Sequence, residues 1–169
     1  MNKYFENFDL KLFWEEDDEQ PKKMTNKMVE EAEKKLGYKL PKSFIELLKS
    51  RNGGRPINTC FPTIEKTSWA DDHIGIDTIL GIGVEYGIDD KCGSNYLIEE
   101  WDYPAIGVVI YSSGHDAVML DYSECGKEGE PRVVYIDTET ENGESKVTVL
   151  AQDFEAFIKG LVNEEEFDT

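Results

Sequence analysis

Residues 112–137, SSGHDAVMLDYSECGKEGEPRVVYID, gather the side-chain types that an active site uses. A Ser-His-Asp triad needs its base within hydrogen-bond reach of the nucleophile. Adjacent strand residues point to opposite faces, so His115 and Asp116 cannot act together if both lie in a strand. No GxSxG nucleophile elbow is present. We therefore expect no catalysis here, and interpret the stretch as a loop leading into a strand, where His115 or Asp116 fixes the local backbone.

The spacing of the histidines, glycines and cysteines does not indicate a metal or cofactor site. The two histidines, His73 and His115, do not combine with nearby acids in a spacing typical of metal ligands. The glycines of LGIGVEYG miss the dinucleotide fingerprint by one residue, and no βαβ pattern follows them. The sequence therefore predicts no metal and no cofactor. The three cysteines are widely spaced, which is typical of reduced thiols: Cys60, Cys92 and Cys125.

The chain carries a formal net charge of −18, from 18 Lys and Arg against 36 Asp and Glu. Phosphate binding depends on cations, so this charge argues against nucleic acid as a direct ligand and against an anionic membrane surface. Residues 21–56 carry ten bases against four acids, whereas residues 57–169 carry six against twenty-five. The acidic part favours a basic protein partner through electrostatic steering. Acidity also keeps a protein soluble, so composition alone leaves both roles open.

The elements that position these residues follow from hydrophobic spacing. Residues 1–24 read as an aromatic and acidic arm, 25–54 as two helices, 55–150 as a sheet and 151–164 as a closing helix. Thr25 or Asn26 can cap the first helix, and Gly37 can end it. A short helix or turn is expected near 99–104. Strands are expected near six segments: 57–61, 76–82, 105–111, 116–122, 132–138 and 145–149.

This order of elements predicts one α+β domain over residues 1–169. It should have two N-terminal helices, a central mostly antiparallel sheet of about six strands, and a C-terminal helix packed on that sheet. No apolar run approaches the roughly 18 residues of a membrane span, and the first residues do not resemble a signal peptide. We therefore expect a cytoplasmic protein.

Six stretches in a fixed order give the chain a specific pattern. The pattern begins with EEAEKKLGYKLPKSFIELLKSRNGG at 30–54 and continues through NTCFPT (58–63), TSWADDHI (67–74), IEEWDYPAIGVVI (98–110), SGHDAVMLDYSECGKEGEPRVVYID (113–137) and DFEAFIKGL (153–161). Taken together, these stretches resemble the SUKH superfamily, and most closely its Smi/Knr-type branch of bacterial proteins. The resemblance covers nearly the whole chain.

The resemblance implies an α+β binding module without catalysis. Bacterial members of this superfamily are widely assigned as immunity proteins, which bind a cognate toxin domain, often a nuclease. Fungal members act instead as scaffolds in cell-wall signalling. Family residues that transfer by position are Asn52-Gly53-Gly54 and the pair His115 and Asp116, and each could equally be a signature of the fold.

We therefore expect an immunity-type protein that binds a basic toxin domain through an acidic surface. A scaffold or regulatory module for an endogenous protein is the alternative, and a hydrolase built on His115 is a third hypothesis. Trp69 would supply an apolar anchor, because tryptophan is enriched at binding hot spots. The other candidate contact residues are Asp71, Asp72, Asp89, Asp90, Asp102, His115 and Asp116.

Overall fold

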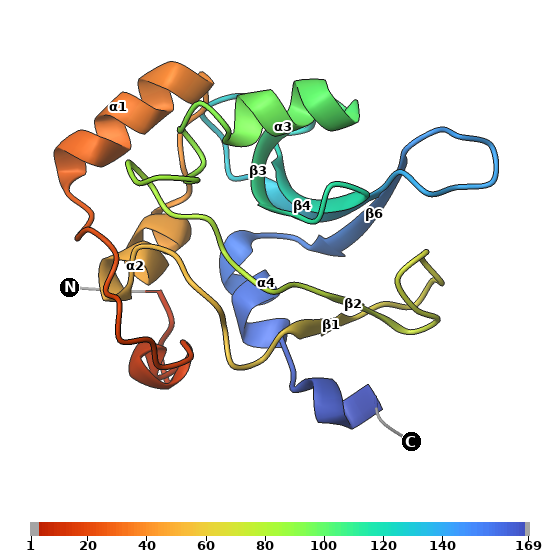
Figure 1. Ribbon diagram of the computed structural model, residues 1–169, viewed down its shortest axis with the longest axis horizontal. Coiled ribbons are helices and arrows are strands. Elements are labelled where there is room, and N and C mark those ends of the chain that lie inside the picture. Colours follow the sequence, from red (N-terminus) through yellow and green to blue (C-terminus); the bar gives the residue numbers. More distant parts are fainter. Residues whose placement is uncertain (1–3, 168–169) are drawn as a thin grey trace.

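The structure is a computed structural model that describes residues 4–167, and it places four α-helices and six strands in that range (Figure 1). Two 3₁₀ turns, η1 (Leu10–Leu12) and η2 (Glu164–Phe167), lie near the ends. The helices are α1 (Asn26–Leu36), α2 (Lys42–Ser50), α3 (Ser94–Trp101) and α4 (Phe154–Gly160). The strands are β1 (Cys60–Pro62), β2 (His73–Gly75), β3 (Gly107–Ser112), β4 (Asp116–Asp121), β5 (Arg132–Asp137) and β6 (Lys146–Ala151).

The first helix begins and ends where the sequence predicts. Thr25 Oγ1 accepts a hydrogen bond from the N–H of Met28, which satisfies one of the free donors of the first turn. Gly37 ends α1 in a left-handed conformation, with φ of 81°. The second helix follows Pro41 directly, and its Phe44 and Leu47 are fully buried. The predicted pair of N-terminal helices is therefore confirmed.

A four-stranded antiparallel meander, in the order β3-β4-β5-β6, forms the centre of the fold. Helix α4 covers one face of this sheet and α3 covers the other (Figure 1). On β4, Val118 and Leu120 pack on the α4 side, while Ala117 and Met119 pack on the α3 side. Both faces of β4 are buried, so the strand expected near 116–122 is an inner strand of the sheet.

The six strands form two sheets rather than the single sheet that was expected. Strand β2 was not predicted from the sequence, and the strand expected at 76–82 is absent. That segment is a loop, because its main chain pairs at a single bridge between Ile79 and Gly54. Its isoleucines are nevertheless buried, which explains why its composition looked like that of a strand. The separate two-stranded sheet pairs β1 with β2 in antiparallel register. Helix α3 also begins earlier than the expected turn at 99–104.

The N-terminal segment packs through its aromatic side chains. Phe5, Phe13 and Trp14 are buried, and Trp14 Nε1 donates to Ser50 Oγ at 2.9 Å. The N–H of Phe5 donates to Glu155 Oε2 at 2.6 Å, so this segment is tied to α4 as well as to α2. In the described part of the chain, no helix combines the length and the apolar character that crossing a bilayer requires.

Candidate functional site

Asp116, the first residue of β4, lies inside the protein and not on its surface. Its side chain is only 5% exposed, so the expectation that it offers a carboxylate to a partner is corrected. Tyr135 Oη donates to Asp116 Oδ2 at 2.5 Å, and Ser113 Oγ bonds to the other carboxylate oxygen. Burial, and then the hydrogen bond to Asp116, raise the pKa of Tyr135 far above its ordinary value. Tyr135 therefore remains a neutral donor to a buried acid.

The turn between β3 and β4 is held by backbone contacts and does not assemble a catalytic triad. Tyr103 Oη lies 2.5 Å from the carbonyl oxygen of Gly114 and 2.7 Å from Ser112 Oγ. The ring of His115 is exposed and lies beside Glu139, with 3.4 Å between Nδ1 and Oε1. Among residues 4–167, no hydrogen bond joins the His115 ring to a serine or to Asp116. The geometry fixes a turn and provides no activated nucleophile.

A second buried acid, Asp137, anchors the loop that carries Trp69. The N–H of Ser68 and its hydroxyl both donate to the Asp137 carboxylate, at 2.9 and 2.6 Å. Asp137 is the last residue of β5 and is 3% exposed. Sequence reasoning missed this contact, although an acid at the end of an otherwise apolar strand was a visible signal. Ser68 is thereby fixed directly beside Trp69.

The indole of Trp69 is half exposed and rests on the backbone of β2. A Cβ at Gly75 would lie 2.8 Å from Trp69 Cζ2, so a larger residue there would displace the ring. The N–H of Trp69 also donates to Thr67 Oγ1 at 3.2 Å. Asp71 and Asp72 follow on the same loop and are exposed. The structure therefore brings together three of the predicted contact residues.

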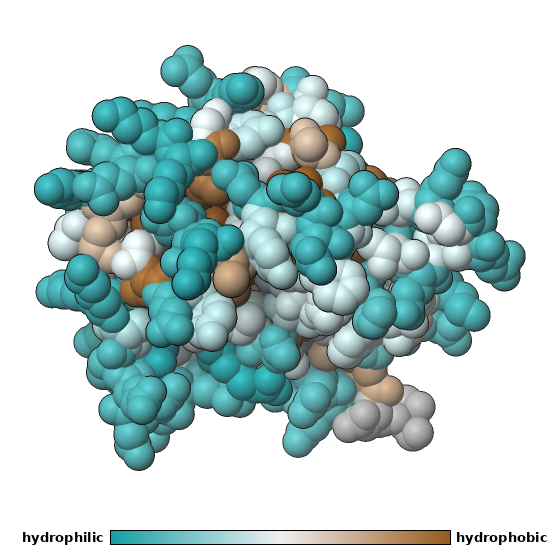
Figure 2. Space-filling model, turned by 45° about the horizontal axis from the view of Figure 1, so that its top comes forward, coloured by the Kyte–Doolittle hydropathy of each residue, from teal (hydrophilic) through white to brown (hydrophobic). Residues whose placement is uncertain are grey.

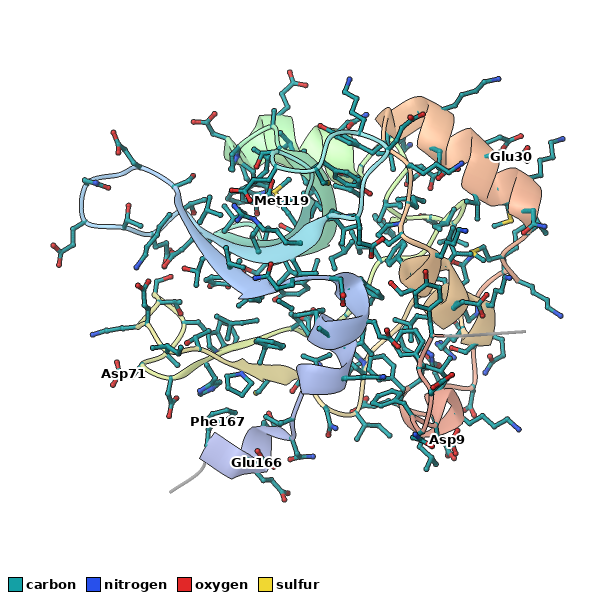
Figure 3. The ribbon with its side chains drawn as sticks, turned by 180° about the vertical axis from the view of Figure 1, so that it is seen from behind. Asp9, Glu30, Asp71, Met119, Glu166 and Phe167 are labelled. Carbon is teal, nitrogen blue, oxygen red and sulfur yellow. The ribbon has the colours of Figure 1, made fainter. Side chains whose placement is uncertain are left out.

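A pocket of about 330 Å³ opens beside Trp69. His73 stacks on Phe167 of η2 along one wall, with 3.9 Å between ring centroids, and Figure 3 shows Phe167 below the loop that carries Asp71. Burial, and then the charge of Asp116, raise the pKa of Tyr111 in the same wall. The pocket thus combines aromatic rings with three charged side chains, Arg55, Asp77 and Glu164. Across residues 4–167, no three His, Cys, Asp or Glu side chains gather as metal ligands.

Three other predicted contact residues lie apart from Trp69, and each has a role in the structure of its own segment. Asp89 Oδ1 accepts from the N–H of Gly83 at 2.8 Å, and Asp90 Oδ2 accepts from the N–H of Tyr86 at 3.0 Å. Figure 1 places this loop beside α1, on the opposite side of the fold from the β1–β2 loop. Asp102 ends α3 in a left-handed conformation, with φ of 56°. These acids therefore have local structural roles.

Two acidic loops project from the same side of the protein, and we call them the acidic loop pair. They are residues 63–72, which join β1 to β2, and residues 138–145, which join β5 to β6 (Figure 1). The first contains three acids and one lysine, and the second contains three acids and no base. Figure 2 shows the β5–β6 loop as a hydrophilic projection at the right. The exposed acids are Glu65, Asp71, Asp72, Glu139, Glu141 and Glu144.

Comparison with known proteins gives a match over most of the chain. The model of a protein family described as SUKH_6, SMI1-KNR4 cell-wall, matches residues 26–158. The matched region includes both N-terminal helices, both sheets and most of α4. No curated protein and no solved structure matches the chain.

Proposed function

Because the chain belongs to the SUKH, or SMI1-KNR4, family, we propose that it is an immunity-type protein that neutralises a cognate bacterial toxin domain. It acts by forming a protein–protein complex and not by catalysis. The absence of an activated nucleophile at Ser113 and His115 supports this reading within the described residues. The partner is a basic toxin domain, such as a nuclease, which must present cations where phosphate binds.

The observation that carries this proposal is the Trp69 loop. Tryptophan supplies a large contact area at a small cost in conformational entropy, and it is enriched at binding hot spots. Asp137 holds the loop through Ser68 before any partner arrives, so little ordering is needed on binding. Asp71 and Asp72 then place negative charge beside the indole. An anchored indole with an acidic border matches the cleft of a basic partner.

The experiment measures binding to the toxin domain encoded by the adjacent gene, using the purified full-length chain. We expect a complex with a dissociation constant below micromolar, and protection of cells that express both proteins. Trp69→Ala should weaken binding tenfold or more, which corresponds to about 1.4 kcal/mol. Tyr96→Ala, which removes an exposed aromatic ring from α3, is the matched control and should leave affinity unchanged. No complex at micromolar concentration, together with no protection, would overturn the proposal.

The alternative is a non-catalytic scaffold or regulatory module that binds an endogenous protein. The description of the family refers to the cell wall, and this observation favours the scaffold function as the second candidate. The two functions differ in genomic context, because an immunity gene lies beside a gene for a large secreted protein with a C-terminal toxin domain. Affinity capture that returned only endogenous partners, from a strain lacking such a neighbour, would favour the scaffold.

A further inference from the structure

The last strand of the main sheet, β6, has one unpaired edge. It pairs with β5 on one side and stands at the end of the strand order. Among the described residues, no main-chain hydrogen bond links β6 to any segment other than β5. The opposite edge of the sheet is covered, since the N–H of Leu80 donates to Ile110 and the N–H of Val109 donates to Ser94 Oγ. Only the β6 edge therefore exposes a row of free donors and acceptors in residues 4–167 of this sheet.

A groove of about 460 Å³ runs along that edge. One wall is β6, from Val147 to Leu150, and the other is the start of the β1–β2 loop, from Pro62 to Glu65. The side chains of Val147 and Val149 are 40% and 42% exposed, and Ile64 is fully exposed. Figure 1 shows β6 and the β1–β2 hairpin running past each other on the side where the acidic loops project.

Negative charge surrounds this apolar groove. Lys146 Nζ lies 3.3 Å from Glu65 Oε2, so one ion pair joins the two walls. Both side chains are about half exposed, and such a pair contributes little and can be exchanged. The neighbouring loop adds three exposed acids with no base: Glu139, Glu141 and Glu144. A basic ligand would therefore be attracted to the groove and could replace Lys146 as the partner of Glu65.

We propose that this groove accepts an extended strand from a basic partner protein, which adds to the sheet along β6. Main-chain hydrogen bonds to the free edge supply affinity, and every second side chain of the added strand meets Val147, Val149 and Ile64. The remaining side chains, if they are lysine or arginine, meet Glu65 and the acids of the 138–145 loop. The identity of the partner as a toxin domain rests on the function proposed above, whereas the groove can be tested alone.

A second copy of this chain is a poorer occupant. Each molecule carries a formal net charge of −18, so two copies repel one another as they approach. Exposed valines without a partner would equally favour aggregation, which proteins usually prevent at strand edges with charges or bulges. A basic strand can pair with the free main-chain groups of β6, cover the exposed valines and neutralise the nearby acids.

The first test is a titration of the isotopically labelled full-length protein, followed by NMR. The probe is a capped nine-residue peptide of alternating lysine and valine. We expect chemical-shift changes confined to residues 62–65 and 138–150. A capped peptide of alternating glutamate and valine is the charge control and should cause none. Changes with both peptides, or changes spread over the acidic surface, would overturn the proposal.

Two further peptides separate strand addition from simple charge attraction. Each is the lysine–valine peptide N-methylated at every second residue, in one of the two registers. Methylation of the set that faces β6 removes the donors needed for pairing, so one of the two peptides should lose binding at least tenfold. If both bind as well as the parent, then strand addition is wrong, even though charge attraction persists.

A pair of variants then tests the groove in the complete complex. Val147→Lys with Val149→Lys should weaken binding of the toxin domain tenfold or more, whereas Val147→Thr with Val149→Thr keeps β-branched side chains and should have a smaller effect. Unfolding curves confirm that both variants fold. Toxin binding that is unchanged in the lysine variant overturns the groove while leaving the proposed function intact. If the peptide binds but the toxin domain does not, the groove is supported and the proposed function is overturned. A dimer in sedimentation that the lysine variant abolishes would assign the edge to a second copy.

Discussion

Ser68 donates its main-chain N–H and its hydroxyl to the carboxylate of Asp137, at 2.9 and 2.6 Å. The two residues are 69 positions apart, and the contact joins the β1–β2 loop to the end of β5. Asp137 also accepts from the N–H of Glu139 at 3.0 Å, where the second acidic loop begins. One buried carboxylate thus fixes the middle of the β1–β2 loop and the start of the β5–β6 loop, and it links the central sheet to the exposed indole of Trp69.

Replacing Asp137 by asparagine should release the Trp69 loop. The amide can accept through one oxygen only, so at least one of the three donors loses its partner, at a cost of about 1–3 kcal/mol of unfolding free energy. Urea unfolding measures this loss, and NMR relaxation of the Trp69 indole N–H measures the gain in mobility. Ser68→Ala keeps the main-chain bond and should give a smaller change in both. An indole as rigid in Asp137→Asn as in the parent would show that Gly75 packing alone holds it.

Local sequence signals were sufficient for much of the fold. Thr25 and Gly37 bound α1 because capping is a short-range interaction. The apolar run within β4 predicted a strand at 116–122, because a short apolar run with a polar residue at each end is typical of a strand buried on both faces. Residues 76–82 were assigned wrongly because a loop that buries its isoleucines has the same composition as a strand. Whether a segment pairs along its length depends on distant partners, which no local pattern contains.

Replacing Asn52 by alanine should destabilise the protein strongly. Asn52 is buried, and its Nδ2 donates to the carbonyls of Lys22 and Ile82, while its Oδ1 accepts from the N–H of Ile82. Each buried partner left unsatisfied costs about 1–3 kcal/mol. Asn52→Asp keeps the acceptor but places a buried carboxylate oxygen against the carbonyl oxygens of Lys22 and Ile82, so it should destabilise the protein at least as much as alanine does. Chemical unfolding measures both variants, and a loss below about 1 kcal/mol for alanine would contradict a structural role for the Asn52-Gly53-Gly54 signature.

The ion pair between Asp121 and Arg132 should make stability depend on acid pH. Burial raises the pKa of Asp121, but hydrogen bonds from Ser123 and the Arg132 guanidinium, at 2.8 Å, outweigh it and leave the pKa below its usual value. The unfolded state then binds more protons, so this contribution is present above the unfolded pKa of about 3.9 and is lost as pH falls through the folded pKa. Asp121→Asn should therefore be more destabilising at pH 7 than at pH 3 in urea titrations. An equal loss at both pH values would contradict it.

The candidate site was only partly predictable from the sequence. Trp69, Asp71 and Asp72 are neighbours in the chain, so their shared exposure on one loop could be anticipated. Asp116 looked equally suitable, yet it is buried by Tyr135, which comes from the adjacent strand. The free edge of β6 was invisible, because an edge is defined by the strand that is missing beside it. Residue type predicts chemistry, whereas exposure depends on the packing of distant segments.

The placement of charge, and not its total, should control the rate of toxin binding. Asp71→Asn with Asp72→Asn removes two charges from the acidic loop pair, and Glu30→Gln with Glu31→Gln removes two from α1. Figure 3 shows Asp71 and Glu30 at opposite ends of the molecule. Attraction is screened over about 8 Å at physiological salt, so the loop variant alone should slow association several-fold at low salt, with little difference at 0.5 M. Stopped-flow association with the toxin domain measures both. Equal slowing by the two variants would mean that net charge alone steers the partner and that the acidic loop pair has no special role.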